Sequence, residues 1–318
     1  MVRMLRYLLA IILAVLAPAW TFAAPPHNLV LPANVPGILD HIYSGRRDLA
    51  LEETHQLEQQ SPNDPLGYLL EAEVEWWRIW FASAEFKYGM TTARRRDKSP
   101  ADAHYFELTS KAYLLAETSL RQRDSGEMRL YAGLADALAG RLYSLRGEYR
   151  ATARAGVRSR ENFLKALALD PTLSDAYLGL GLYNYYVDTL STVARVLRFV
   201  MGIPGGSKQE GIRQLQRAMN EGQLTAVLAR FYLAQNLHAF DQQYEQALQT
   251  IGPLVEKYPE NPIFQLTRGD LYAKLGRRAL ADASYRAASA AAEHVPEVEC
   301  RAKLALLVKE SLAALNAR

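Results

Sequence analysis

The sequence predicts an all-α fold in which pairs of helices stack in series along the chain. The last clear pair is expected between Pro262 and Ala292, with a turn at Gly276 and small residues where the two helices would touch. Leu254 follows Ala218 by 36 residues and Ala288 follows Leu254 by 34, so the unit recurs at a nearly constant length. No alternation of apolar and polar residues convincingly marks a β-strand. Because a single pair cannot bury its apolar face alone, neighbouring pairs must cover it.

The first 23 residues predict a signal peptide. Arg3 and Arg6 supply its positive start, and the apolar run at 7–16 is shorter than a membrane span of about 20 residues. Small residues precede an expected cut after Ala23, and an uncleaved N-terminal anchor is the alternative. Residues 24–36 are rich in proline and predict an extended leader. We therefore expect a periplasmic or secreted protein.

Charge and cysteine content limit the partners of the mature chain. Of 37 lysines and arginines, removal of Arg3 and Arg6 leaves 35 against 34 acidic residues, a net charge of +1. Bulk charge gives no support for a nucleic-acid partner, and membrane contact is expected only through targeting or peripheral association. Cys300 is the only cysteine in the sequence, so an intrachain disulfide is impossible and a buried structural thiol is the expected state.

Residues 37–147 are expected to form diverged helical repeats. Apolar spacing and turn residues predict helices at 37–43, 48–60, 66–88, 101–123 and 126–146. Ser99 and Pro100 predict the start of the fourth of these helices. The run Arg94-Arg95-Arg96-Asp97-Lys98 falls in a predicted loop. A solvated loop is the simpler interpretation of this run, and contact with anionic lipid or an acidic partner is the alternative.

Residues 148–294 are expected to form the regular part of the array. Ala166 closes one unit, and Ala218 holds the equivalent position in the next. These two alanines are 52 residues apart instead of 34, which predicts an insertion of 18 residues within 187–206. Apolar spacing inside the insertion predicts a short extra helix at 190–200.

The last helix pair carries a family resemblance. Gly269 and Tyr272, followed by Ala281 and Tyr285, occur in an order that resembles the tetratricopeptide repeat (TPR) family. The resemblance implies a right-handed α-solenoid of TPR-like helix pairs, with one insertion and a C-terminal capping helix. We expect the cap at 295–318, because an open end of the array would expose its apolar core.

The same resemblance implies a concave groove lined by the first helix of each pair. Its candidate partner-binding residues, extended more weakly toward the N-terminus, are Trp76, Trp77, Tyr185, Tyr186, Tyr232, Asn236, Phe240, Asp270 and Lys274. This aromatic and mildly polar face suits a protein or peptide segment with apolar anchors. The alternative is that the large aromatic side chains belong to the core. Recognition of an acidic chaperone C-terminus is not expected, because Leu178 and Tyr232 stand where that clamp uses lysine.

Sequence motifs give no support for an enzyme, a cofactor or a metal site. The six histidines show no i, i+4 pair and no HExxH motif. The segment 202–208 lacks the order of a phosphate-binding loop. Glu71, Glu73 and Glu75 point to different faces of a helix, so they make a poor acid–base pair.

Two functions remain from the sequence. The first is a non-enzymatic scaffold or adaptor of the cell envelope that binds a partner protein or peptide in the groove. The alternative is a helical carrier of a small apolar ligand, or an accessory component of an envelope transport system, with its pocket near Trp76 and Trp77.

Overall fold

The computed structural model describes residues 29–94, 97–190 and 202–317. The predicted signal peptide at 1–23 lies outside these ranges, as does all but the first residue of the predicted helix at 190–200. Within them the fold is helical with one short β-hairpin, and none of its helices is long and apolar enough to cross a membrane.

The described part of the chain contains 13 helices and two strands. The N-terminal elements are α2 (Val35–Tyr43), α3 (Arg47–Gln60), α4 (Pro65–Ser83), β1 (Ala84–Lys87), β2 (Met90–Ala93), α5 (Pro100–Gln122), α6 (Gly126–Arg146) and α7 (Tyr149–Leu169). The C-terminal elements are α8 (Ala176–Asp188), α10 (Lys208–Glu221), α11 (Ala226–Ala239), α12 (Tyr244–Lys257), α13 (Pro262–Lys274), α14 (Arg278–Glu293) and α15 (Val298–Asn316). The all-α prediction is therefore confirmed, apart from the hairpin.

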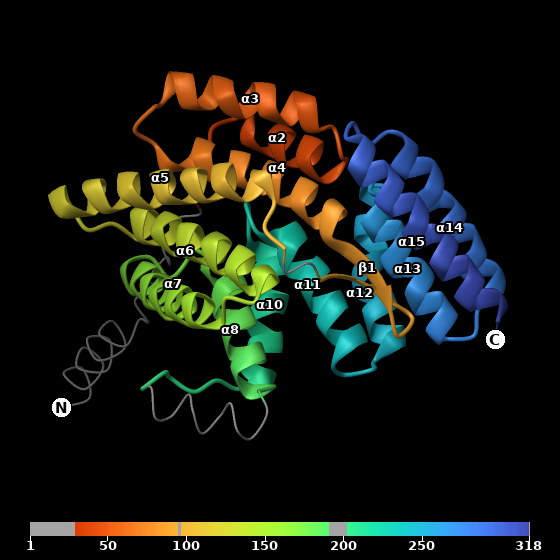
Figure 1. The fold of residues 1–318 in the computed structure, drawn as a ribbon. Helices are drawn as coiled ribbons and strands as arrows, with labels where there is room; N and C mark the ends of the chain where they lie inside the picture. Colours follow the sequence, from red (N-terminus) through yellow and green to blue (C-terminus); the bar gives the residue numbers. More distant parts are fainter. Residues whose placement is uncertain (1–28, 95–96, 191–201, 318) are drawn as a thin grey trace, which may run out of the picture.

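The helices pack in the order in which they follow one another in the chain (Figure 1). Each helix contacts the next, and alternate helices also touch: α2 with α4, α4 with α6, α6 with α8, α8 with α11, α11 with α13 and α13 with α15. We call these seven the A helices and the six between them the B helices. Two rows of helices therefore run side by side, and each pair is covered by its neighbours.

Local sequence determines where several of these helices begin and end. At the start of α5, Ser99 Oγ accepts a hydrogen bond from the Ala101 N–H, and an Asp102 carboxylate oxygen accepts one from the Ser99 N–H. Gly147 ends α6 with φ +77° and Gly276 follows α13 with φ +71°, a left-handed conformation that favours glycine. The predicted start at Ser99 and the predicted turn at Gly276 are both confirmed.

Glycines allow the closest helix contacts. A Cβ atom added at Gly269 on α13 would lie 2.5 Å from the ring of Tyr285 on α14. At Gly133 on α6, an added Cβ would lie 2.7 Å from the ring of Phe163 on α7. Both rings are fully buried, so each glycine fits a large aromatic side chain of the next helix.

The hairpin corrects two expectations. The helix predicted at 66–88 ends at Ser83, and the loop expected after it begins with two antiparallel strands in which Ala84 pairs with Ala93. Tyr88 and Gly89 form the turn between the strands with φ of 56° and 72°. Each strand has only four residues, too few for a visible alternation, and both pack against the C-terminal helices. Tertiary contact therefore stabilises strands that the local pattern does not reveal.

The two ends of the helical array meet. Helix α4 and the hairpin contact α13 and α15, which are more than 170 residues later in the chain (Figure 1). Tyr258 donates a hydrogen bond to Asp40 Oδ1 at 2.8 Å, and Asn261 Nδ2 donates one to the backbone oxygen of Tyr43 at 2.9 Å. The helix predicted as a terminal cap, observed as α15, thus packs against α14 and also against α4 and β1.

Candidate functional site

The two tryptophans predicted to line the groove lie in the core. Trp76 and Trp77, both on α4, are each 4% exposed. The Trp77 ring lies 5.7 Å from the rings of both Phe231 and Phe264, on α11 and α13. Trp77 therefore packs α4 against two other A helices, and neither tryptophan offers an open surface to a partner. Burial of aromatic surface explains this placement, because such side chains contribute most when they are removed from water.

Three further predicted groove residues are also buried. Tyr185, Asn236 and Asp270 are each at most 1% exposed. Asn236 connects two helices, because its backbone oxygen accepts a hydrogen bond from Tyr185 at 3.3 Å and its Oδ1 accepts one from Tyr186 at 3.0 Å. These side chains hold α8 against α11 and are not free to contact a partner. Tyr232, also a predicted groove residue, is partly buried and packs against the core.

Two predicted groove residues are exposed and lie together. Tyr186 on α8 is 38% exposed, and Phe240 at the end of α11 is 55% exposed. Their ring centroids are 6.1 Å apart, and both rings contact Tyr185 at 5.7 and 5.9 Å. We call Tyr185, Tyr186 and Phe240 the aromatic cluster. Its outer two rings form an apolar surface with a buried tyrosine beneath them.

The C-terminal positions predicted to line the groove bind the chain's own hairpin. Asp270 Oδ2 accepts a hydrogen bond from the Thr91 N–H at 2.6 Å, and Asp270 Oδ1 accepts one from the Tyr285 hydroxyl at 3.1 Å. Lys274 Nζ donates a hydrogen bond to the backbone oxygen of Tyr88 at 2.7 Å. Burial raises the pKa of the Asp270 carboxyl to about 7. The polar residues on this face of α13 thus bind an extended backbone, supplied in this structure by β2 and its turn.

A buried ion pair lies at the centre of the A helices. Arg141 on α6 donates a hydrogen bond to Glu73 Oε2 on α4 at 2.7 Å and another to the Tyr105 hydroxyl at 3.1 Å. Its guanidinium carbon lies 4.1 Å from the centre of the Trp76 ring. Burial raises the pKa of the Glu73 carboxyl, although the arginine beside it acts in the opposite direction. Sequence spacing did not reveal this pair, because its residues are 68 positions apart.

The other two glutamates of α4, Glu71 and Glu75, face different partners, as their spacing predicts. Glu75 pairs with Arg47. Glu71 lies 2.9 Å from His104 Nε2 and 3.3 Å from His55 Nε2. Burial raises the pKa of the neighbouring Glu58 carboxyl to about 8, and its contact with Glu71 adds to the rise. Among the described residues, no three His, Cys, Asp or Glu side chains are grouped so as to hold a metal ion.

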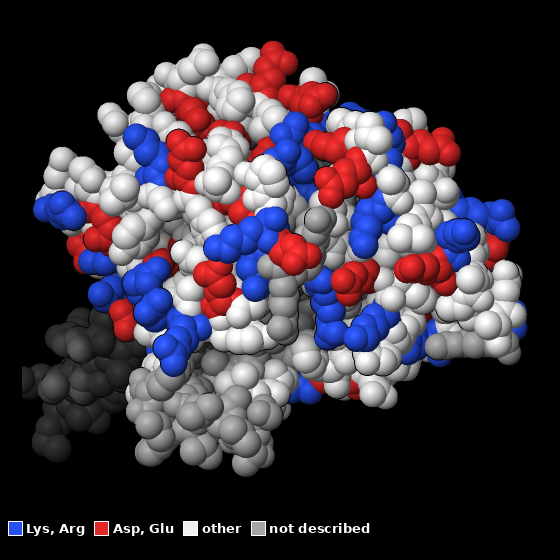
Figure 2. Space-filling model, in the orientation of Figure 1, with Lys and Arg blue, Asp and Glu red and all other residues white. Residues whose placement is uncertain are grey.

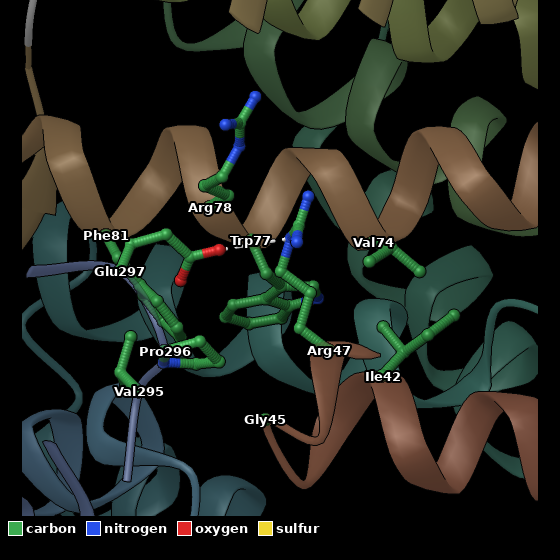
Figure 3. Close-up of a pocket in the computed structure, with 10 residues that line it drawn as sticks. All are labelled: Ile42, Gly45, Arg47, Val74, Trp77, Arg78, Phe81, Val295, Pro296 and Glu297. Carbon is green, nitrogen blue, oxygen red and sulfur yellow. Dashed lines mark ion pairs between the residues drawn. The ribbon is translucent and has the colours of Figure 1, made fainter. Parts of the chain in front are cut away.

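A small cavity lies beside Trp77, between α3, α4 and the residues before α15 (Figure 3). Arg47 crosses its mouth and pairs with Glu75 at 2.6 Å and with Glu297 at 3.1 Å. The free volume of the cavity is about 20 Å³, which is room for one water molecule. This cavity is too small for an apolar ligand, so it does not support the carrier function.

No family model matches this chain, and no curated protein matches it. The resemblance to TPR proteins therefore stays a prediction from the residues of the last helix pair.

Proposed function

We propose that this protein is a non-enzymatic adaptor of the bacterial cell envelope. In this proposal it is a right-handed α-solenoid of TPR type that holds a segment of a partner protein at the aromatic cluster. Contacts between consecutive helices and between neighbouring A helices support the solenoid. The predicted signal peptide supports export to the periplasm or beyond.

The exposure of Tyr186 beside Phe240 is the observation that carries the partner site. Single apolar side chains on a surface are common, whereas adjacent exposed aromatic rings mark contact sites for proteins. The buried Tyr185 and Asn236 fix the position of the outer rings, so little conformational freedom is lost when a partner packs on them.

The hairpin limits where such a partner binds. Asp270 and Lys274 are already engaged with the backbone of Thr91 and Tyr88. In this proposal a partner segment contacts α8 and α11 and does not extend to α13. The occupied part still supports a peptide-binding role, because it demonstrates how α13 contacts an extended chain.

The test compares capture of envelope proteins by crosslinking with wild type, Tyr186→Ala and Phe240→Ala. Leu114→Ala is the matched control, since Leu114 on α5 is 59% exposed and lies outside the cluster. We expect a specific crosslinked partner to be lost with both cluster variants and kept with the control, while circular dichroism stays unchanged. Equal capture by all four proteins would refute the site.

Export is tested separately. Mass spectrometry of the protein recovered from the envelope fraction should give a chain that begins at Ala24. Recovery of the intact chain from the cytosol would contradict the proposed location.

A further inference from the structure

Basic residues from two separate segments meet at the start of α7. The loop between β2 and α5 carries Arg94 and Lys98, and α7 carries Arg150 and Arg154. Lys98 Nζ lies 3.4 Å from Glu148 Oε1, and Glu148 is the residue that precedes α7. The tertiary structure therefore places Lys98 of the loop beside the charges of the helix. We call Lys98, Arg150 and Arg154 the basic surface.

Two arginines at the start of α7 keep their charge available. Arg150 and Arg154 are exposed and one helical turn apart, so they lie on the same side of α7. Neither has an ion-pair partner within the parts of the chain that the structure describes. The next arginine on that side, Arg158, is instead hydrogen-bonded to Asp136. Two positive charges without an ion-pair partner among the described residues thus lie in the first two turns of the helix.

An exposed tyrosine lies among these charges. Tyr149 is 65% exposed, and a shallow depression is lined by residues 147–151 together with Arg154. Tyrosine is favoured where one side of a ring meets apolar material and the other meets water, as at the headgroup level of a membrane. The combination of arginine with tyrosine distinguishes this surface from a merely solvated helix.

Acidic residues reduce the local charge without cancelling it. Asp97 and Glu148 are the acidic neighbours in the two segments, against the three residues of the basic surface. Figure 2 shows Lys and Arg side chains gathered on the face where α6 and α7 lie in Figure 1, with acidic side chains interspersed. Such a surface attracts an anionic layer through many weak contacts even though the chain as a whole is nearly neutral.

We propose that the basic surface binds the phosphate-rich surface of an anionic phospholipid membrane and holds the protein there peripherally. The arginines contact lipid phosphates, and Tyr149 lies at the headgroup level. This function is independent of the aromatic cluster and its partner. It also gives a role to Lys98, the residue of the predicted basic loop that lies beside the start of α7.

The test measures binding of the full chain to vesicles by co-sedimentation. One set of vesicles contains about 30 mol% phosphatidylglycerol in phosphatidylcholine, and the other is pure phosphatidylcholine. The variant Arg150→Glu with Arg154→Glu reverses the two arginine charges at the start of α7. The control, Arg121→Glu with Arg123→Glu, makes the same change in charge at the opposite end of α5 from Lys98, where both arginines are also exposed. The apolar N-terminal stretch is common to all proteins, so it does not affect their comparison.

We expect wild type and the control to bind the anionic vesicles, and the α7 variant to bind them roughly tenfold or more weakly. Binding should also fall when the salt concentration is raised from about 0.1 M to about 0.5 M, because screening shortens the reach of the charges. Equal binding to both kinds of vesicle, an equal loss in the control, or no binding by wild type would each overturn the proposal.

Discussion

Replacing Asp270 with asparagine should change how the stability of this protein depends on pH. Asp270 is fully buried, and its carboxyl holds the hairpin to α13 through the Thr91 N–H. Burial raises the pKa of this carboxyl from the ordinary 3.8 to about 7, although the hydrogen bonds from Thr91 and Tyr285 act to lower it. Lys274 on the same helix also lowers it. The folded protein therefore keeps a proton at pH values where the unfolded chain has lost it.

The direction in which stability changes with pH follows from this difference in bound protons. A group whose pKa is higher in the folded state stabilises the fold below its unfolded pKa and loses that contribution as pH rises toward the folded pKa. For Asp270 the window runs from 3.8 to about 7. With about 1.4 kcal/mol for each pH unit, the contribution lost between pH 5 and pH 8 is about 2–3 kcal/mol. The side-chain amide of the Asp270→Asn variant has no proton to lose in this range, so the variant should gain this amount relative to wild type.

The assay is urea unfolding of both proteins at pH 5 and at pH 8. At pH 5 the variant should be less stable than wild type, because the amide cannot accept both hydrogen bonds made by the carboxyl. By pH 8 that deficit should shrink or reverse. Asp282→Asn is the control: Arg286 lowers the pKa of the Asp282 carboxyl, which is therefore ionised throughout the range. A difference between wild type and the Asp270 variant that stays constant with pH would refute the reasoning.

Three further predictions test the packing of the helices. Gly269→Ala should destabilise the protein by roughly 1–3 kcal/mol, because the new methyl overlaps a buried tyrosine ring; Gly252→Ala, with open space at its Cβ position, should be neutral or stabilising in the same thermal melts. Arg141→Ala should reduce the free energy of unfolding, measured by urea titration, by roughly 3–5 kcal/mol, because it leaves Glu73 buried without its partner. Replacing both residues with apolar ones should recover part of this loss in the same titrations. The Cys300 thiol, whose pKa burial raises to about 12, should react with a disulfide reagent only as fast as the fold opens, and a rate equal to that of a free thiol would show that it is accessible.

The sequence by itself determined most of the helices. Caps such as Ser99 and turns such as Gly276 act within a few residues, so their effect can be read from local order. The fit between Gly269 and Tyr285 also follows from local order, because the two residues belong to one helix pair. The helical secondary structure and the order of the helices along the chain depend on these short-range interactions. In both respects the structure agrees with the prediction.

Only the tertiary structure decided which predicted groove residues are open. The end of the array returns to α4, so Trp76 and Trp77 enter the core, and Asp270 binds the hairpin instead of a partner. Tyr186 and Phe240 stay exposed because no later element covers them among the described residues. Periodicity gives the side of a helix on which a residue lies, but not what packs on that side. Contacts between segments more than 170 residues apart depend on how every intervening helix pair is stacked, and no local pattern carries that information.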